Sequence, residues 1–214
     1  MGIMTSHLTN NFGRQISTLA NAKVQQELNR RRECRKAIID HALNVMNKVD
    51  RPEEVSTTAL IAKMAIPRDV FKRLFDGIDD FQDALIEEGW KELMRQLRIM
   101  ATQAGGRKGL DGITRAYRNY VKENSGAYYV AMCQGRDTPV GRKYVSRLGR
   151  LLYIVLASCD LGQIDLSRAA QNLADVLHGL AVMEITGETF GEVDDTVTHI
   201  LKVYLNDLFN GAKA

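Results

Sequence analysis

Apolar residues recur along most of the chain at spacings of three and four residues, the period of a helix that buries one face. The clearest stripes lie after residue 37, over an expected helix at 79–102, and on both sides of a break near residue 135: Ile38, Ala42, Val45, Val49; Ile86, Trp90, Leu93, Leu97, Met100; Leu110, Ile113, Tyr117, Tyr120; Tyr144, Leu148, Leu151, Val155. No run of alternating β-branched residues competes, and the chain has only three prolines. The pattern predicts an all-α protein.

The last two expected helices, over residues 166–186 and 193–209, are apolar on more than one face. Their apolar residues are Leu173, Val176, Leu177, Leu180, Met183, then Val197, Ile200, Leu201, Tyr204, Leu205, Leu208 and Phe209. A helix that is apolar on two sides must bury both, one of them against a surface outside its own domain. A second copy of the chain is the simplest such surface, so we expect a homodimer joined by a four-helix bundle.

Residues 57–75 form two predicted short helices separated by Ala65-Ile66-Pro67. Ser56 or Thr57 can cap the first helix, because a hydroxyl satisfies free N–H groups in its first turn. Pro67 cannot continue that helix but suits the start of a new one, where no N–H donor is needed. Once Phe71, Leu74 and Phe75 turn inward, the second helix exposes Arg68, Asp69, Lys72 and Arg73. Two such helices beside a longer basic helix predict a helix-turn-helix, whose second helix fits a DNA major groove.

Residues 36–85 resemble the DNA-binding domain of the TetR family of bacterial transcriptional regulators. The matching elements are Ala37-Ile38-Ile39 through Ala42-Leu43, Thr57-Thr58, Ile61-Ala62, the turn Ala65-Ile66-Pro67, Phe71 and Phe75 in the recognition helix, and Phe81 to Leu85 in the next helix. The likeness continues more weakly into the second half, where Leu177-His178-Gly179-Leu180 is similar to a Trp-His-Gly element of one subgroup.

The resemblance implies three parts: a polar and basic arm (1–29), a three-helix helix-turn-helix domain (30–83), and a larger helical bundle that binds an effector and dimerises (84–212). We expect the arm to be mobile as far as residue 28 and to end at a basic cluster. The DNA-binding residues implied in this way are Arg30, Arg31, Arg32, Thr57, Thr58, Pro67, Arg68, Asp69, Val70, Lys72 and Arg73. For the basic residues, an ordinary solvated helix face stays an open alternative.

A small-molecule effector site in the second domain is also implied by the resemblance. Aromatic and sulfur side chains with a few polar groups suit an apolar ligand cavity: Tyr117, Tyr120, Tyr128, Tyr129, Met132, Cys133, Tyr153, His178 and Met183. Each of them also suits a plain core. His178 is the best single candidate, because a histidine beside a glycine on a buried helix needs a polar partner.

Three positions depart from the family pattern. Ala65 stands where the turn usually has glycine, Lys72 where the recognition helix usually has tyrosine, and Ile78 where a lysine usually follows that helix. Lys72 can still reach a phosphate. Ile78 is flanked by Asp76 and by Asp79-Asp80, so we expect one phosphate contact to be lost at this position.

Charge is distributed unevenly along the chain. Residues 1–75 hold 13 basic and 7 acidic residues, whereas the rest hold 16 basic and 19 acidic residues, within a net charge of +3. The basic end is therefore the candidate for a polyanionic partner. Three widely spaced cysteines, Cys34, Cys133 and Cys159, argue against a disulfide framework and indicate a cytoplasmic protein. We expect no membrane span and no secretory signal.

Catalytic signals are weak. The run Asp79-Asp80-Phe81-Gln82-Asp83 is similar to a magnesium-diphosphate motif, but Asp194-Asp195 offers no matching second cluster. Aspartates also favour the start of any helix through its dipole. The segment 105–109 lacks the spacing of a phosphate loop, and the four histidines lack metal-ligand spacing. We expect no enzyme activity, catalytic residue, metal or cofactor.

The sequence thus predicts a homodimeric, ligand-responsive regulator, a repressor that a small molecule releases from a palindromic DNA operator. The alternative is a TetR-like module that binds a ligand or a protein and has lost specific DNA binding, which Ala65 and Ile78 favour.

Overall fold

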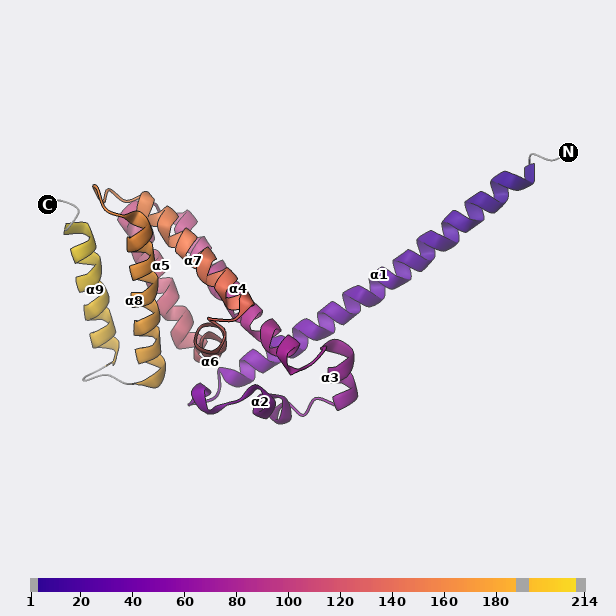
Figure 1. Ribbon diagram of the computed structural model, residues 1–214, viewed down its shortest axis with the longest axis horizontal. Coiled ribbons are helices and arrows are strands. Elements are labelled where there is room, and N and C mark those ends of the chain that lie inside the picture. The colour runs from indigo at the N-terminus through magenta and orange to yellow at the C-terminus, as the bar shows by residue number, and fades with distance from the viewer. Residues whose placement is uncertain (1–3, 188–192, 211–214) are drawn as a thin grey trace.

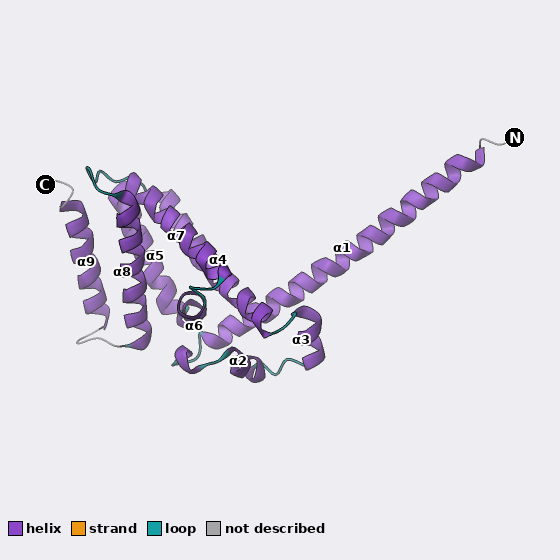
Figure 2. Ribbon diagram, viewed as in Figure 1, coloured by secondary structure: helices purple, strands orange, loops and turns teal. Residues whose placement is uncertain are grey.

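The computed structural model describes residues 4–187 and 193–210, and its regular elements over these ranges are all helical (Figures 1 and 2). In chain order they are α1 (Met4–Met46), the 3₁₀ turn η1 (Pro52–Glu54), α2 (Thr57–Lys63), α3 (Arg68–Leu74), α4 (Ile78–Gln103), α5 (Gly106–Glu123), α6 (Ser125–Tyr128), the π-helix η2 (Tyr129–Gln134), α7 (Pro139–Ala157), α8 (Leu166–Thr186) and α9 (Val193–Asn210). The all-α prediction is confirmed.

The small N-terminal domain consists of α2, α3 and the adjoining ends of α1 and α4. Figure 1 shows α2 and α3 beside the inner end of α1, where the domain meets α4. On α1 the core is shifted from the predicted stripe, because Ile39, Ala42 and Met46 are buried whereas Ile38, Val45 and Val49 are half-buried. The inward faces of the following helices complete it with Leu60, Leu74, Phe75 and Phe81.

The N-terminal arm differs from the prediction. Residues 4 to 28 are not separate from the first helix, because α1 continues without a break to Met46 and projects far from the rest of the molecule (Figure 1). The physical reason is the absence of proline: the first proline is Pro52, and Ala, Leu, Gln, Glu and Arg are frequent between residues 19 and 36. Arg30, Arg31 and Arg32 therefore lie within a helix.

The C-terminal domain is a bundle built on α4. This helix packs against α5 and α7, α8 packs against α7 and α5, and α9 lies along α8 at the far side from the arm (Figure 1). The ring of Trp90 on α4 is fully buried and stacks on Tyr144 of α7, with 5.8 Å between ring centroids. Over the described residues, no helix is both long and apolar enough to cross a membrane.

The two domains meet where the end of α1 docks against α6. The Asn47 side-chain oxygen accepts a hydrogen bond from the Ala127 N–H at 2.7 Å, and the Asn47 amide donates to the Asn124 side chain at 3.2 Å. Gly126 makes this approach possible, because a Cβ atom at that position would lie 2.2 Å from the carbonyl carbon of Met46. The backbones of α1 and α6 therefore touch directly.

Replacing Gly126 by alanine should destabilise the protein, because a methyl group would push the two backbones apart. Overpacking of this kind costs about 1–3 kcal/mol, measurable as the free energy of unfolding in urea. The matched control is Gly179→Ala on α8, where an added Cβ meets no atom within 4 Å. That control should stabilise the helix by about 0.5–1 kcal/mol. Equal effects of the two substitutions would contradict the proposed close contact.

Candidate functional site

Helix α2 begins at a serine cap. The Ser56 hydroxyl oxygen accepts a hydrogen bond from the Ala59 N–H at 3.1 Å, so Ser56, rather than Thr57, satisfies the free donor. Leu60 is the buried anchor of this short helix. The cap and the anchor fix where the first half of the helix-turn-helix starts and which side faces inward.

The turn between α2 and α3 holds Ala65 in the left-handed region, with φ of 50°. Among the described residues other than glycine, Ala65 alone has positive φ. An L-residue pays roughly 1–2 kcal/mol for this conformation because its Cβ approaches the backbone. Ala65 therefore occupies a position that geometry reserves for glycine, in agreement with the departure noted in the sequence.

Helix α3 begins after Pro67, which takes the N-cap position with φ of −56° and ψ of 134°. Leu74 and Phe75 are buried, Phe71 and Val70 are half-buried, and Arg68, Asp69, Lys72 and Arg73 are exposed. The predicted inward and outward faces of this helix therefore match the structure.

A bidentate ion pair between Arg35 and Asp80 holds this arrangement together. The two guanidinium nitrogens donate to the two Asp80 oxygens at 2.6 and 2.7 Å, and Arg35 also donates to the Leu74 carbonyl at 2.8 Å. Asp80 in turn accepts the Asp76 N–H at 3.0 Å. The pair therefore joins α1, the end of α3 and the start of α4.

The partners of this pair shift each other's protonation equilibria. The hydrogen bond from Arg35 lowers the pKa of Asp80 most, against a smaller opposing effect of burial, and the hydrogen bond to Asp80 raises the pKa of Arg35. Both side chains are about one-third exposed, so solvent screens part of their attraction. The bidentate geometry is the more important contribution, because it fixes direction as well as distance.

Three phenylalanines pack beneath the ion pair. The ring centroids of Phe71, Phe75 and Phe81 lie 5.0–5.5 Å apart, and the Arg35 guanidinium lies 4.6 Å from the centre of the Phe75 ring. Edge-to-face aromatic pairs and a cation over a ring are both favourable. The cluster fills the inner side of α3 and leaves its outer side to the solvent.

The exposed side of α3 presents cations that the fold does not use. Arg68 and Lys72 make no ion pair with any residue in the described ranges. Arg73 is paired with Asp69 one turn earlier, at 3.0 Å. Two unneutralised cations on a protruding helix suit contacts to phosphate oxygens or base edges.

A groove of 780 Å³ separates α3 from the arm part of α1. Arg30 and Arg31 line one wall, and Val70 and Arg73 line the other. The structure thus brings two of the three predicted arm arginines near the recognition helix, whereas Arg32 is exposed and does not line this groove. Thr58 and Pro67 are exposed and Thr57 is half-buried, near the two ends of α2.

In the C-terminal domain, three predicted ligand residues form one buried hydrogen-bonded chain. The hydroxyl oxygens of Tyr117 and Tyr128 are 2.9 Å apart, and the Tyr128 hydroxyl lies 2.7 Å from His178 Nδ1. The predicted polar partner of His178 is therefore Tyr128. Burial, with a smaller effect of Arg136, lowers the pKa of His178. A neutral imidazole has one donor and one acceptor nitrogen, so the donor in the Tyr128–His178 bond follows the tautomer of the ring, and either hydroxyl of the tyrosine pair can donate to the other.

The rest of the predicted cavity is mostly packed core. Tyr120 is buried and donates to the Gly89 carbonyl at 2.9 Å, Met132 is buried, and Met183 is half-buried. The cleft beside Tyr117, between α5, α8 and α9, holds only 10 Å³, room for about one water molecule.

Tyr153 is placed differently from the prediction. Its side chain is 42% exposed, because the buried stripe of α7 runs through Leu152, Val155 and Leu156 and leaves residue 153 on the outer side. Tyr153 therefore does not join the cluster formed by Tyr117, Tyr128 and His178.

Two residues that orient α3, Arg35 and Asp80, are not among the functional residues predicted from the sequence. One signal was present: Arg35 lies four residues before Ile39 and so continues the apolar stripe of α1. A cation on a buried stripe needs a buried partner. Within the aspartate run at 79–83, Asp80 accepts the hydrogen bonds of Arg35. No group of three side chains that could ligate a metal occurs within the described ranges.

Comparisons with known proteins agree with this geometry. Residues 110–204 match the family model of the tetracyclin repressor-like C-terminal domain. A protein of unknown function from Rhodococcus sp. RHA1 has a similar structure, with a TM-score of 0.62 and 20% identity over 82% of this chain and 95% of that chain. The presumed regulatory protein SCO4313 is similar too, with a TM-score of 0.62 and 19% identity over 85% of this chain and 98% of that chain. No curated protein matches the sequence.

The resemblance to the TetR family is therefore confirmed. The chain has the all-α TetR fold, with a helix-turn-helix domain followed by a tetracyclin repressor-like C-terminal domain. The likeness to the two solved structures, at 20% and 19% identity, is a likeness of fold.

Replacing Ala65 by glycine should stabilise the protein, because glycine adopts positive φ without steric cost. The relief is about 1–2 kcal/mol, and the greater freedom of glycine in the unfolded chain offsets about 0.4–1 kcal/mol of it. Urea unfolding should therefore show a net gain. The control is Ala62→Gly on the exposed side of α2, which should cost about 0.5–1 kcal/mol. A loss of stability in both variants would show that the turn is not strained.

Stability should depend on pH through His178. Its pKa is lower in the folded protein than the usual value, so protonation favours the unfolded state. The contribution is fully present above about pH 6.5, and is lost as the pH falls toward the lowered folded value. Melting temperatures between neutral and mildly acidic pH should fall less steeply for His178→Gln than for the natural protein. His41→Gln, on an exposed position of α1, should keep the natural slope.

Proposed function

We propose that the protein is a homodimeric, ligand-responsive transcriptional repressor that reads a palindromic DNA operator with helix α3. The observation that carries the proposal is the outward face of α3, where Arg68 and Lys72 are exposed and lack ion-pair partners among the described residues. The Arg35–Asp80 pair supports it, because a recognition helix must be held rigidly to read base edges.

The basic N-terminal region provides the attraction to DNA. Residues 1–75 carry the positive excess of the chain, and Arg30 and Arg31 face α3 across the groove. Basic side chains that neutralise phosphates release counterions, so they strengthen binding at low salt. A helical arm that projects from this domain can follow the DNA backbone beyond the footprint of α3.

Dimerisation through α8 and α9 would place two copies of α3 in successive major grooves. The outer face of α9 carries Ile200 and Val203, 37% and 44% exposed, where the sequence predicts a partner surface. Half-sites one helical turn apart are about 34–36 Å from centre to centre. An effector that binds more tightly to a form of the dimer in which the two α3 helices have a different separation would release the DNA.

The alternative, a TetR-like module that binds a ligand or a protein but no specific DNA, is favoured by one observation at the base of α3. Ile78 is 45% exposed at the first position of α4, where the family pattern usually has a lysine. An exposed isoleucine beside Asp79 offers a phosphate neither a charge nor a hydrogen bond. Any remaining attraction to DNA phosphates would then come from Arg68, Lys72 and the basic arm.

DNA binding should be measured on the DNA that flanks the protein's own gene, with random DNA of equal length as reference, over a series of salt concentrations. We expect a preference for the flanking DNA. Lys72→Gln should weaken binding, because it removes one phosphate contact. For the same reason the slope of the logarithm of the affinity against the logarithm of the salt concentration should become shallower by about one. Lys143→Gln, an exposed lysine on α7, removes the same charge far from α3 and should change neither quantity.

Equal affinity of the natural protein for flanking and random DNA would favour the alternative function. An unchanged salt slope in Lys72→Gln would show that α3 does not face the phosphates.

A further inference from the structure

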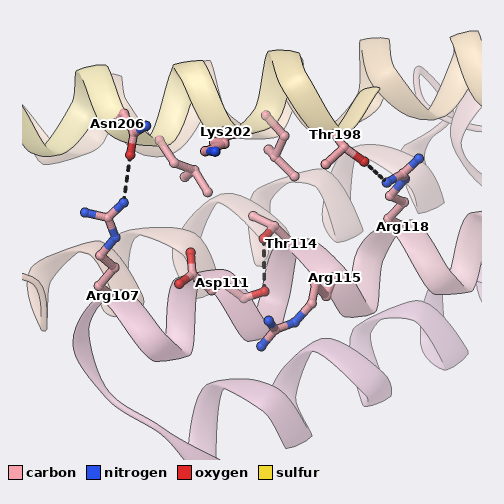
Figure 3. Close-up of a pocket in the computed structure, with 10 residues that line it drawn as sticks. Arg107, Asp111, Thr114, Arg115, Arg118, Thr198, Lys202 and Asn206 are labelled. Carbon is pink, nitrogen blue, oxygen red and sulfur yellow. Dashed lines mark hydrogen bonds between the residues drawn. The ribbon is translucent and has the colours of Figure 1, made fainter. Parts of the chain in front are cut away.

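An open groove of 390 Å³ runs between α5 and α9 in the C-terminal domain. Figure 3 shows α5 on one side, with Arg107 and Arg118 near the two ends, and α9 on the other, with Asn206, Lys202 and Thr198. None of Tyr117, Tyr128 and His178 lines this groove, and Tyr117 lines only the small neighbouring cleft. Its volume lies in the usual range of small-molecule sites, roughly 300–1,000 Å³.

Two arginines of α5 hold α9 by hydrogen bonds at the ends of the groove. Arg107 donates to the Asn206 side-chain oxygen at 2.8 Å, and Arg118 donates to the Thr198 hydroxyl at 2.6 Å. The two arginines are three helical turns apart, roughly 16 Å by the helix rise. Lys202 projects from α9 between these two bonds (Figure 3). Arg107, Arg118 and Lys202 thus line a common open groove.

The positive charge in the groove is only partly neutralised. Arg118 pairs with Glu184 at 2.5 Å, and one carboxylate, Asp111, also lines the groove. Arg107 and Lys202 make no ion pair with any residue that the structure describes. Cations that gather in a groove without matching carboxylates attract an anion and raise its local concentration.

The groove also has an apolar part. Leu201 and Leu205 of α9 line it, with Leu205 buried, and the Arg107 guanidinium lies over the Phe209 ring at 4.7 Å. A fully inorganic anion would gain nothing from this surface. A ligand with both a charged group and a hydrocarbon body would use both parts.

The geometry points to a binding site for an amphipathic organic anion, such as a carboxylate or sulfonate on an aromatic or aliphatic body. Its charged group lies between Lys202 and Arg107, and its body covers Leu201 and Leu205. Charge-assisted hydrogen bonds from these two side chains set the direction of the ligand.

Such a ligand would act on α9, the helix whose outer face carries Ile200 and Val203. The regulatory consequence rests on the proposed function: an anion that ties α9 to α5 would favour one position of the dimerising helix over others. The binding site itself does not depend on DNA recognition, so the two proposals can fail separately.

The test uses the full chain, without DNA, and a fluorescent organic anion, anilinonaphthalenesulfonate. The neutral comparator is N-phenylnaphthylamine, which keeps the aromatic body and lacks the sulfonate. We expect saturable binding of the anion that weakens as sodium chloride is raised, and weaker binding of the neutral dye. Lys202→Gln should reduce the affinity for the anion by about fivefold to tenfold. Because Lys202 is exposed and makes no described ion pair, the variant should fold normally.

Arg115→Gln is the matched control. It removes a cation from the same helix wall, but Figure 3 shows the Arg115 guanidinium pointing away from α9, so the affinity should stay within about twofold of the natural protein. The proposal is overturned if Lys202→Gln binds the anion as tightly as the natural protein does. Equal affinity for the charged and neutral dyes would also overturn it, because the sulfonate would then make no contact with the cations.

Discussion

The arrangement of the helix-turn-helix depends on one ion pair, Arg35 with Asp80. It joins three helices at the point where α3 ends, since Arg35 also bonds the Leu74 carbonyl. The Arg35–Asp80 pair fixes the guanidinium that covers the phenylalanine cluster. It also fixes the direction in which the cations of α3 point. Loss of either partner would leave the other charge half-buried and the last carbonyl of α3 without its donor.

A second rigid contact connects this domain to the bundle. Helix α4 passes from one domain into the other, and the end of α1 docks on α6 through Asn47 and the space left by Gly126. Two connections of this kind oblige α1 and α4 to move together. A change in the bundle that displaced α6 would therefore turn the whole helix-turn-helix as a unit, which is what a regulator of two reading heads requires.

Most helix positions could be predicted because each helix buries one face. The three-to-four-residue spacing of its apolar residues is therefore visible within its own stretch of sequence. The expected helices at 79–102, 166–186 and 193–209 differ from the observed ones by one residue or less at each end. The site could be predicted only in part. Arg35 and Asp80 are 45 positions apart, and Arg107 and Asn206 are 99 apart. Their contacts depend on how helices pack, which no local period records. The continuous α1 was missed for the opposite reason: a polar segment carries no apolar stripe, yet no proline in it ends the helix.

The strain at Ala65 and the lost lysine at Ile78 have different meanings for DNA binding. The conformation of Ala65 is imposed from both sides, by the Ser56 cap and Leu60 on α2 and by Arg35 and the phenylalanines on α3. Strain of this size persists only where the surroundings over-determine the backbone. The turn therefore keeps its shape without glycine, at a cost in stability and not in the direction of α3. Ile78 changes no geometry but offers no charge at the base of the helix, where the family pattern usually has a lysine. The attraction that this face exerts on a polyanion therefore depends on how many cations α3 and the arm present, and not on the turn.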